Sequence, residues 1–130
     1  MSEAVAFALR EVTFAYEQVP ALRNLSLTIG RGQSVALLGA NGSGKSTLLR
    51  TLDALCFPNS GSISFYGGPL TPRALQDDDF FLSFRRRVAL VFQNPDVQLF
   101  NPTVFDEVAF GPLQMGWSSP EVTARVNAAL

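Results

Sequence analysis

Residues 35–55, VALLGANGSGKSTLLRTLDAL, decide the fold that this sequence predicts. The first four residues form a short, unbroken apolar run, which is typical of a strand buried on both faces. Residues 39–44 are rich in glycine, and leucines then recur at helical spacing from Lys45 to Leu55. Residues 39–46 match the pattern G-x-x-x-x-G-K-[ST] at every fixed place, in the order of strand, loop and helix that this pattern requires. This context argues against a chance match in an ordinary glycine-rich loop.

Each part of this segment suits the binding of a phosphate group. Glycines let successive backbone N–H groups turn toward one point, and the start of a helix adds free N–H donors and partial positive charge. Lys45 brings a full charge to the β- and γ-phosphates, and the Ser46 hydroxyl can bind Mg²⁺. We therefore predict a nucleotide site whose contacts come from Gly39, Ala40, Asn41, Gly42, Ser43, Gly44, Lys45, Ser46 and Thr47.

Composition excludes several other classes of protein. The chain has 130 residues, of which 47% are apolar and 16% charged, so we expect one folded domain. A net charge of -1 gives no electrostatic case for nucleic acid as a partner. No histidine and a single cysteine, Cys56, exclude a disulfide framework, His- or Cys-cluster metal sites and Ser-His or Cys-His catalysis. No apolar run approaches the roughly 20 residues that span a bilayer, and MSEAVAFALRE does not resemble a secretory signal.

Periodicity predicts the elements around the loop. Residues 6–16 and 25–29 alternate as strands and should form an antiparallel hairpin. Residues 63–66 predict a third strand, and the unbroken apolar run 88–92, VALVF, predicts a second strand buried on both faces. Three phenylalanines at helical spacing predict a helix over residues 80–84.

Two helices are predicted farther along the chain. One starts at Pro102, with Asn101 or Thr103 near its cap, and the other starts at Pro120. The runs Asp77–Asp79 and Arg85–Arg87 are interpreted as solvated surface.

In their order, these motifs resemble the ATPase subunits of ABC transporters. VTFAY and ALRNLSLTIGRGQ resemble the opening strands of the family, and GANGSGKSTLLR resembles its phosphate loop and helix. VALVFQNPDVQLF resembles the loop that senses the nucleotide and couples to the membrane partner. QNPDVQLFNPTVFDEVAFGP is most similar to the energy-coupling-factor branch, specifically its cobalt- and nickel-type importers. The resemblance covers nearly the whole chain.

The resemblance implies roles for two further residues. Tyr16 occupies the position of the aromatic residue that stacks on adenine; the alternative is that it packs with Phe14 as an ordinary strand aromatic. Gln93 is the glutamine that senses the Mg–γ-phosphate group, and its amide suits orienting a water or binding the metal. The alternative is that Gln93 only ends a strand. Lys45 and Gln93 are thus the expected catalytic residues, Ser46 and Gln93 the metal ligands, and ATP and Mg²⁺ the cofactors.

The fold implied is α/β, a P-loop NTPase (RecA-like) core with an antiparallel β subdomain, truncated before the second catalytic half. Residues 1–130 would form a partial ABC-type ATP-binding domain. Residues 1–33 would be its antiparallel β portion, 34–95 its phosphate-loop core and 96–130 the start of a helical subdomain.

The motifs for hydrolysis are not found in this sequence. Asp106-Glu107 is its single Asp-Glu pair, but Asn101-Pro102-Thr103 precedes it where a buried strand should stand, so we reject it as the hydrolytic site. No LSGGQ-like signature or late histidine is present. We therefore expect weak ATP binding, hydrolysis near background, exposed apolar patches and unpaired strand edges.

The function implied is the ATP-binding motor subunit of an importer, coupling ATP binding and hydrolysis to uptake, with cobalt or nickel as the expected ion. Its partners would be a transmembrane transporter component and a second ATPase subunit in a head-to-tail dimer, at the cytoplasmic face of the plasma membrane. The alternative is a non-hydrolysing ATP-binding module that docks on a membrane partner through Gln93–Gly111. Phe100, Phe105 and Phe110 fit either a docking surface or a helix core. A GTPase or a kinase is disfavoured, because no N-K-x-D motif and no acceptor-site signature is visible.

Overall fold

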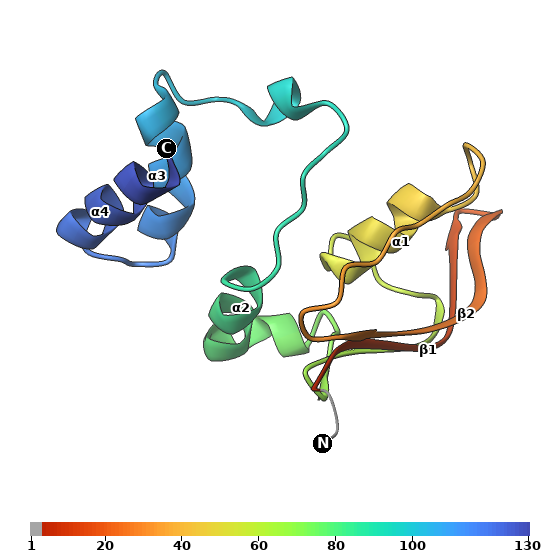
Figure 1. Cartoon of the computed structure of the whole chain (residues 1–130). Coiled ribbons are helices and arrows are strands. Elements are labelled where there is room, and N and C mark those ends of the chain that lie inside the picture. The colour runs from red at the N-terminus through yellow and green to blue at the C-terminus, as the bar shows by residue number, and fades with distance from the viewer. Residues whose placement is uncertain (1–3) are drawn as a thin grey trace. The chain divides into compact units, whose positions relative to one another are not determined.

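The chain folds as two compact units, Met1–Leu90 and Val91–Leu130, in a computed structural model that describes residues 4–130 (Figure 1). The start of the predicted portion 1–33, residues 1–3, lies outside the described residues. The predicted boundaries at residues 33 and 95 stay a prediction.

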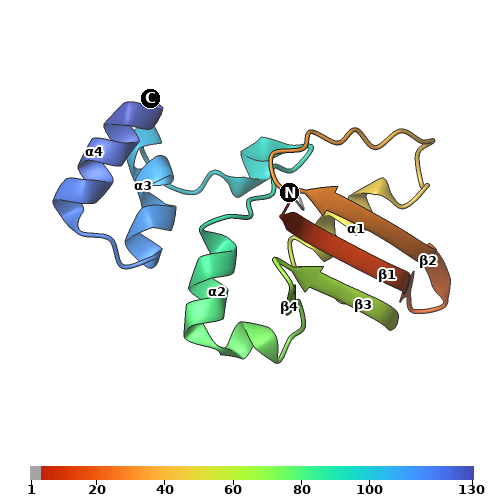
Figure 2. The ribbon, with the colours of Figure 1, turned by 60° about the horizontal axis from the view of Figure 1, so that its bottom comes forward.

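The first unit is built on a sheet of four antiparallel strands in the order β2-β1-β3-β4 (Figure 2). They are β1 (Val5–Tyr16), β2 (Val19–Gly30), β3 (Ser60–Phe65) and β4 (Gly68–Pro69). The hairpin predicted from alternating residues is confirmed. Its turn passes through Glu17 at φ 53, which lets the chain reverse within two residues.

Two helices follow in the same unit, and both contribute to its core. Helix α1 (Lys45–Leu52) lies along one face of the sheet (Figure 2). It ends three residues earlier than predicted, because Asp53 caps it and Ala54 adopts φ 58. Helix α2 (Asp78–Arg85) follows the short 3₁₀ turn η1 (Ala74–Gln76). The buried core consists of Leu9, Val12, Phe14, Leu22, Leu48, Ala54, Ile63, Leu70, Phe65 and Phe84.

Helix α2 refines the interpretation of both charged runs as solvated. Asp77–Asp79 are exposed, but they cap and begin a helix rather than form a loop, and Arg85 is half-buried. The Asp77 carboxylate accepts a hydrogen bond from the Phe80 amide at 2.8 Å and caps the helix, whose first turn contains the next two aspartates. At the other end, Arg85 forms an ion pair with Asp53 at 3.2 Å. A run of like charges can therefore include residues with specific structural contacts when a helix end falls within it.

The two strands predicted to be buried on both faces are not formed, so these predictions are wrong. Residues 35–38 and 88–92 carry no strand pairing in the structure. Leu38 is 94% exposed and Val91 is 83% exposed. A strand needs neighbours that complete its ladder and cover its faces, and within residues 4–130 no strand pairs with either run. The expectation of exposed apolar patches is thereby confirmed.

The second unit contains the 3₁₀ turn η2 (Pro95–Gln98) and helices α3 (Val104–Gln114) and α4 (Ser119–Ala129). Its small core joins Ala109 of α3 to Val122 and Val126 of α4. Helix α3 begins two residues after Pro102, and Thr103 is its cap, with its hydroxyl accepting from the Asp106 amide at 3.1 Å. Among the described residues, none of the helices combines the length and apolar character that crossing a membrane requires.

We predict that the core depends on Phe84 more than on its neighbour Phe81. Phe84 is fully buried and meets Phe65 edge-on at 5.0 Å, whereas Phe81 is 39% exposed. Phe84→Ala should lower the free energy of unfolding by about 3–5 kcal/mol, because it leaves a cavity. Urea denaturation followed by circular dichroism measures the loss. The matched change Phe81→Ala should cost clearly less, and equal losses would contradict this view of the core.

Candidate functional site

The loop of residues 39–44 joins residues 35–38, which carry no strand pairing, to helix α1. The loop and the helix lie where the sequence predicted them. Gly42 and Gly44 adopt φ of 81 and 94, in the left-handed region that favours glycine. A Cβ atom on Gly44 would lie 2.4 Å from the backbone oxygen of Ala21 in β2. The loop can therefore pack against the sheet only with glycine at this position.

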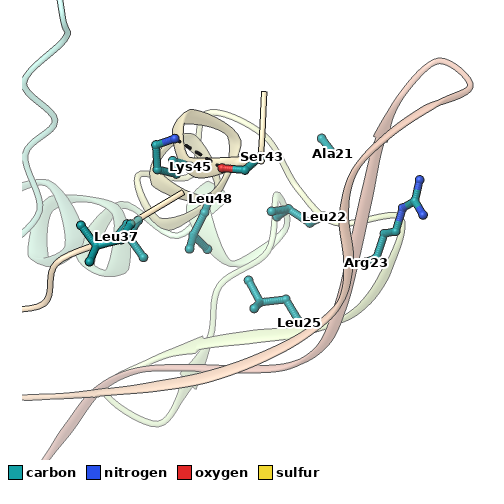
Figure 3. Close-up of a pocket in the computed structure, with 10 residues that line it drawn as sticks. Ala21, Leu22, Arg23, Leu25, Leu37, Ser43, Lys45 and Leu48 are labelled. Atoms are coloured by element: carbon teal, nitrogen blue, oxygen red, sulfur yellow. Dashed lines mark hydrogen bonds between the residues drawn. The ribbon is translucent and has the colours of Figure 1, made fainter. Parts of the chain in front are cut away.

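Lys45 folds back over this loop. Its Nζ donates hydrogen bonds to the carbonyl oxygens of Gly39 at 2.7 Å and Ala40 at 2.8 Å. A third, longer contact of 3.3 Å joins Nζ to the Ser43 hydroxyl (Figure 3). The structure thus brings the predicted lysine and three predicted loop residues together, with the ammonium group held at the start of the loop.

Helix α1 presents a free N-terminus beside the ammonium group. Its cap residue, Gly44, makes no side-chain hydrogen bond, and its first turn contains no acidic residue. Ser46 is exposed in this turn, whereas Thr47 is buried. Free helical N–H groups next to a cation are chemically suited to an anion such as a phosphate.

Tyr16 lies beside the same turn of α1. The Thr47 hydroxyl donates to the Tyr16 hydroxyl at 3.4 Å, and the Tyr16 ring meets Phe14 edge-on at 4.8 Å. The alternative, in which Tyr16 packs as an ordinary strand aromatic, is thus supported by its contact with Phe14. Because Tyr16 remains 43% exposed, part of its surface is also free, and its stacking on adenine stays a prediction.

A hollow of about 320 Å³ adjoins the loop (Figure 3). Leucines at positions 22, 25, 37 and 48 contribute to its walls, together with the polar side chains of Arg23, Ser43 and Lys45. The chain therefore has a concavity with a mostly apolar lining directly beside the loop of residues 39–44.

Gln93 lies in the second unit, exposed after the run 88–92. Its predicted action on a metal held by Ser46 stays a prediction. Among residues 4–130, no group of three or more His, Cys, Asp or Glu side chains that could hold a metal ion is found. The Ser46 hydroxyl, exposed in the first turn of α1, is a ligand type that Mg²⁺ accepts when most of its other ligands are phosphate oxygens and waters.

Glu107 has a role that the sequence did not reveal. Its Oε2 accepts hydrogen bonds from the Asn101 amide at 2.8 Å, the Asn101 side chain at 2.9 Å and the Phe100 amide at 3.3 Å. The hydrogen bonds from Asn101 hold the pKa of the Glu107 carboxyl below its usual value. Together with its place in the first turn of α3, this agrees with rejecting Asp106-Glu107 as the hydrolytic site.

Comparison with known proteins gives consistent matches. The family model described as ABC transporter matches residues 22–130. The nickel import ATP-binding protein NikO of Rhodobacter capsulatus is 58% identical over 125 residues, which are 96% of this chain and 49% of that protein. The nickel import ATP-binding protein LarO of Lactiplantibacillus plantarum is 46% identical over 122 residues, covering 94% of this chain and 51% of that protein.

A solved structure agrees with these relatives. It is cbiO1 from Clostridium perfringens, described as part of the ABC transporter complex cbiONQ, and it aligns with a TM-score of 0.80 at 33% identity. The match covers 98% of this chain and 50% of that one. The chain therefore spans about half the length of the relatives it matches.

We predict that the hydrogen bonds accepted by the Glu107 carboxylate are lost at acidic pH. Because the pKa of Glu107 is lowered in the folded state, its hydrogen bonds stabilise the fold above the ordinary value of 4.5 and are lost as pH falls through the lower, folded-state value. The Asn101 side-chain amide signal, followed by NMR, should shift with a midpoint below 4.5. Glu107→Gln should abolish the shift, and Glu121→Gln, a control in α4, should retain it. A midpoint at or above 4.5 would be inconsistent with the structure.

Proposed function

Because the chain belongs to the ABC transporter family of ATP-binding proteins, we propose that it binds Mg-ATP through residues 39–47. The observation that carries this proposal is the arrangement of Lys45, whose ammonium group lies 2.7 Å from the Gly39 oxygen at the open N-terminus of α1. A cation and free N–H donors converge there, and no acidic side chain in the first turn opposes a phosphate.

Each predicted residue has a distinct part in this proposal. The backbone of residues 39–44 surrounds the phosphates, and Lys45 neutralises charge on the β- and γ-phosphates. Bound Mg²⁺ would neutralise further charge on these phosphates, with Ser46 and Gln93 as its protein ligands. Gln93 would also orient a water, and Tyr16 would stack on adenine with its exposed surface.

We further propose that this chain forms part of the motor subunit of an importer for nickel or cobalt ions. Two relatives, NikO and LarO, are named nickel import ATP-binding proteins, and this supports the choice of ion. The partners would be a transmembrane component and a second ATPase subunit. The chain would act at the cytoplasmic face of the plasma membrane as a peripheral protein.

A second candidate function is a module that binds ATP and docks on a membrane partner without hydrolysing ATP. One observation favours it: the segment Gln93–Gly111 is rich in exposed apolar side chains. Phe100 and Phe110 meet edge-on at 4.8 Å, and both are exposed, so they do not form a helix core. A hollow of about 330 Å³ between α3 and α4 lies next to Phe110.

We predict that Lys45→Ala weakens Mg-ATP binding about ten- to a hundredfold. The substitution removes a charge-assisted contact worth roughly 1.5–3 kcal/mol. Isothermal titration calorimetry measures the dissociation constant. Arg50→Ala is the matched control, because it removes an exposed cation from the last turn of the same helix. Equal affinity in wild type and Lys45→Ala would defeat the assignment of the site.

We also predict that these 130 residues by themselves release phosphate from ATP at or near the background rate. Their Asp-Glu pair, Asp106-Glu107, lies in the first turn of α3, and Glu107 is already bound to Asn101. A phosphate-release assay on the purified chain tests this, with Lys45→Ala as the blank. Turnover at a rate normal for transporter ATPases would refute the prediction. Binding to vesicles that contain the transmembrane component, without turnover, would favour the second candidate function.

A further inference from the structure

The C-terminal end of α1 is fixed by one side chain of α2. Arg85 Nη1 donates to the backbone oxygen of Asp53 at 3.0 Å and to its Oδ1 at 3.2 Å. Asp53 is the cap residue of α1. A single guanidinium group therefore binds both the last carbonyl of the phosphate-loop helix and the carboxylate beside it.

This end of the helix needs a cation. The carbonyl end of a helix carries partial negative charge, and a carboxylate placed there is repelled by it. Arg50 is an exposed cation in the last turn, and Arg85 supplies the opposite charge directly at Asp53. Helix α1 has only eight residues, and a helix this short depends on contacts with its surroundings. At its C-terminal end, Arg85 is the side chain of another helix that contacts the cap residue, through two hydrogen bonds to Asp53.

Arg85 is itself held firmly in place. Its guanidinium carbon lies 5.1 Å from the centre of the Phe84 ring and 5.7 Å from that of Phe81. Phe84 is fully buried against Phe65 of β3. The side chain thus connects α1 to the core of the first unit through α2.

The Asp53 side chain is more buried than its partner, with 10% of its surface exposed against 28% for the Arg85 side chain. Counted with its backbone, Asp53 is only 7% exposed. Burial raises the pKa of the Asp53 carboxyl, and the neighbouring Arg85 acts in the opposite direction without reversing the shift. An ion pair with one buried partner is weak evidence for stability, so we interpret its geometry as positioning α1.

We propose that Arg85 is a positioning residue for nucleotide binding, because it fixes the end of the helix on which Lys45 and Ser46 are mounted. This inference rests on the proposed binding of Mg-ATP by residues 39–47. At about 1.5 Å per residue, α1 is about 12 Å long, so a tilt of about 5° at its C-terminal end displaces its N-terminus by about 1 Å. Such a displacement moves the ammonium group and the free N–H donors together.

The test compares Arg85→Met with Arg86→Met. Both remove one guanidinium group and keep a similar apolar stem, but Arg86 is exposed. At a temperature where circular dichroism shows every variant folded, Arg85→Met should weaken Mg-ATP binding about fivefold or more, in the range usual for coupled sites. Arg86→Met should bind as wild type does. Hydrogen exchange at the amides of residues 47–50 should be faster in Arg85→Met alone.

Two further variants sharpen the test. Asp53→Asn keeps the backbone acceptor, so it should weaken binding less than Arg85→Met does. Arg85→Gln keeps one donor, and it replaces Arg85→Met if that variant does not fold, with a smaller but measurable loss of affinity expected.

Unchanged affinity in folded Arg85 variants would overturn this inference and leave the proposed function intact. An equal loss of Mg-ATP affinity in Arg86→Met would also overturn it, since the effect would then come from the loss of positive charge and not from the contact with Asp53. Absence of Mg-ATP binding by the wild-type chain would overturn the proposed function and the inference with it.

Discussion

The close approach of Gly44 to the Ala21 carbonyl is the constraint on which the first unit depends. A side chain at position 44 would collide with the backbone of β2, and its φ of 94 already favours glycine. Because the loop lies against the sheet at this point, α1 starts beside the end of β1. That placement brings the Tyr16 hydroxyl to the Thr47 hydroxyl and sets the ammonium group of Lys45 over the loop. The relative positions of the sheet, the loop and the helix thus all depend on the packing of Gly44 against Ala21.

The two ends of α1 differ in their capping contacts. The C-terminal end is occupied by Asp53 and Arg85, which are packed near buried Phe84. The N-terminal end has neither an acidic residue nor a side-chain cap. A helix fixed at one end and open at the other presents its free donors from a defined position, which suits the binding of a charged ligand.

Local patterns predicted the hairpin, α1, α2 and the two later helices, because each of these elements is determined by nearby residues. The strands predicted at residues 35–38 and 88–92 are not formed, for a physical reason. A strand buried on both faces depends on neighbouring strands elsewhere in a sheet, and the described residues supply none for these two runs. The loop residues were predicted because their spacing is short and fixed. The contacts of Arg85 and Glu107 were not predicted, since each depends on tertiary structure or on a turn whose path spacing alone does not specify.

The hydrogen bonds of Lys45 to its own loop bear on ligand discrimination. The ammonium group already has two carbonyl partners. If a ligand oxygen replaces one of them, the gain in free energy is the difference between the hydrogen bond to the ligand oxygen and the hydrogen bond to the carbonyl oxygen. That difference is large for an oxygen with a full negative charge and close to nothing for a neutral one. In the proposed nucleotide site, this arrangement of Lys45 would therefore favour polyanions over uncharged molecules of the same shape.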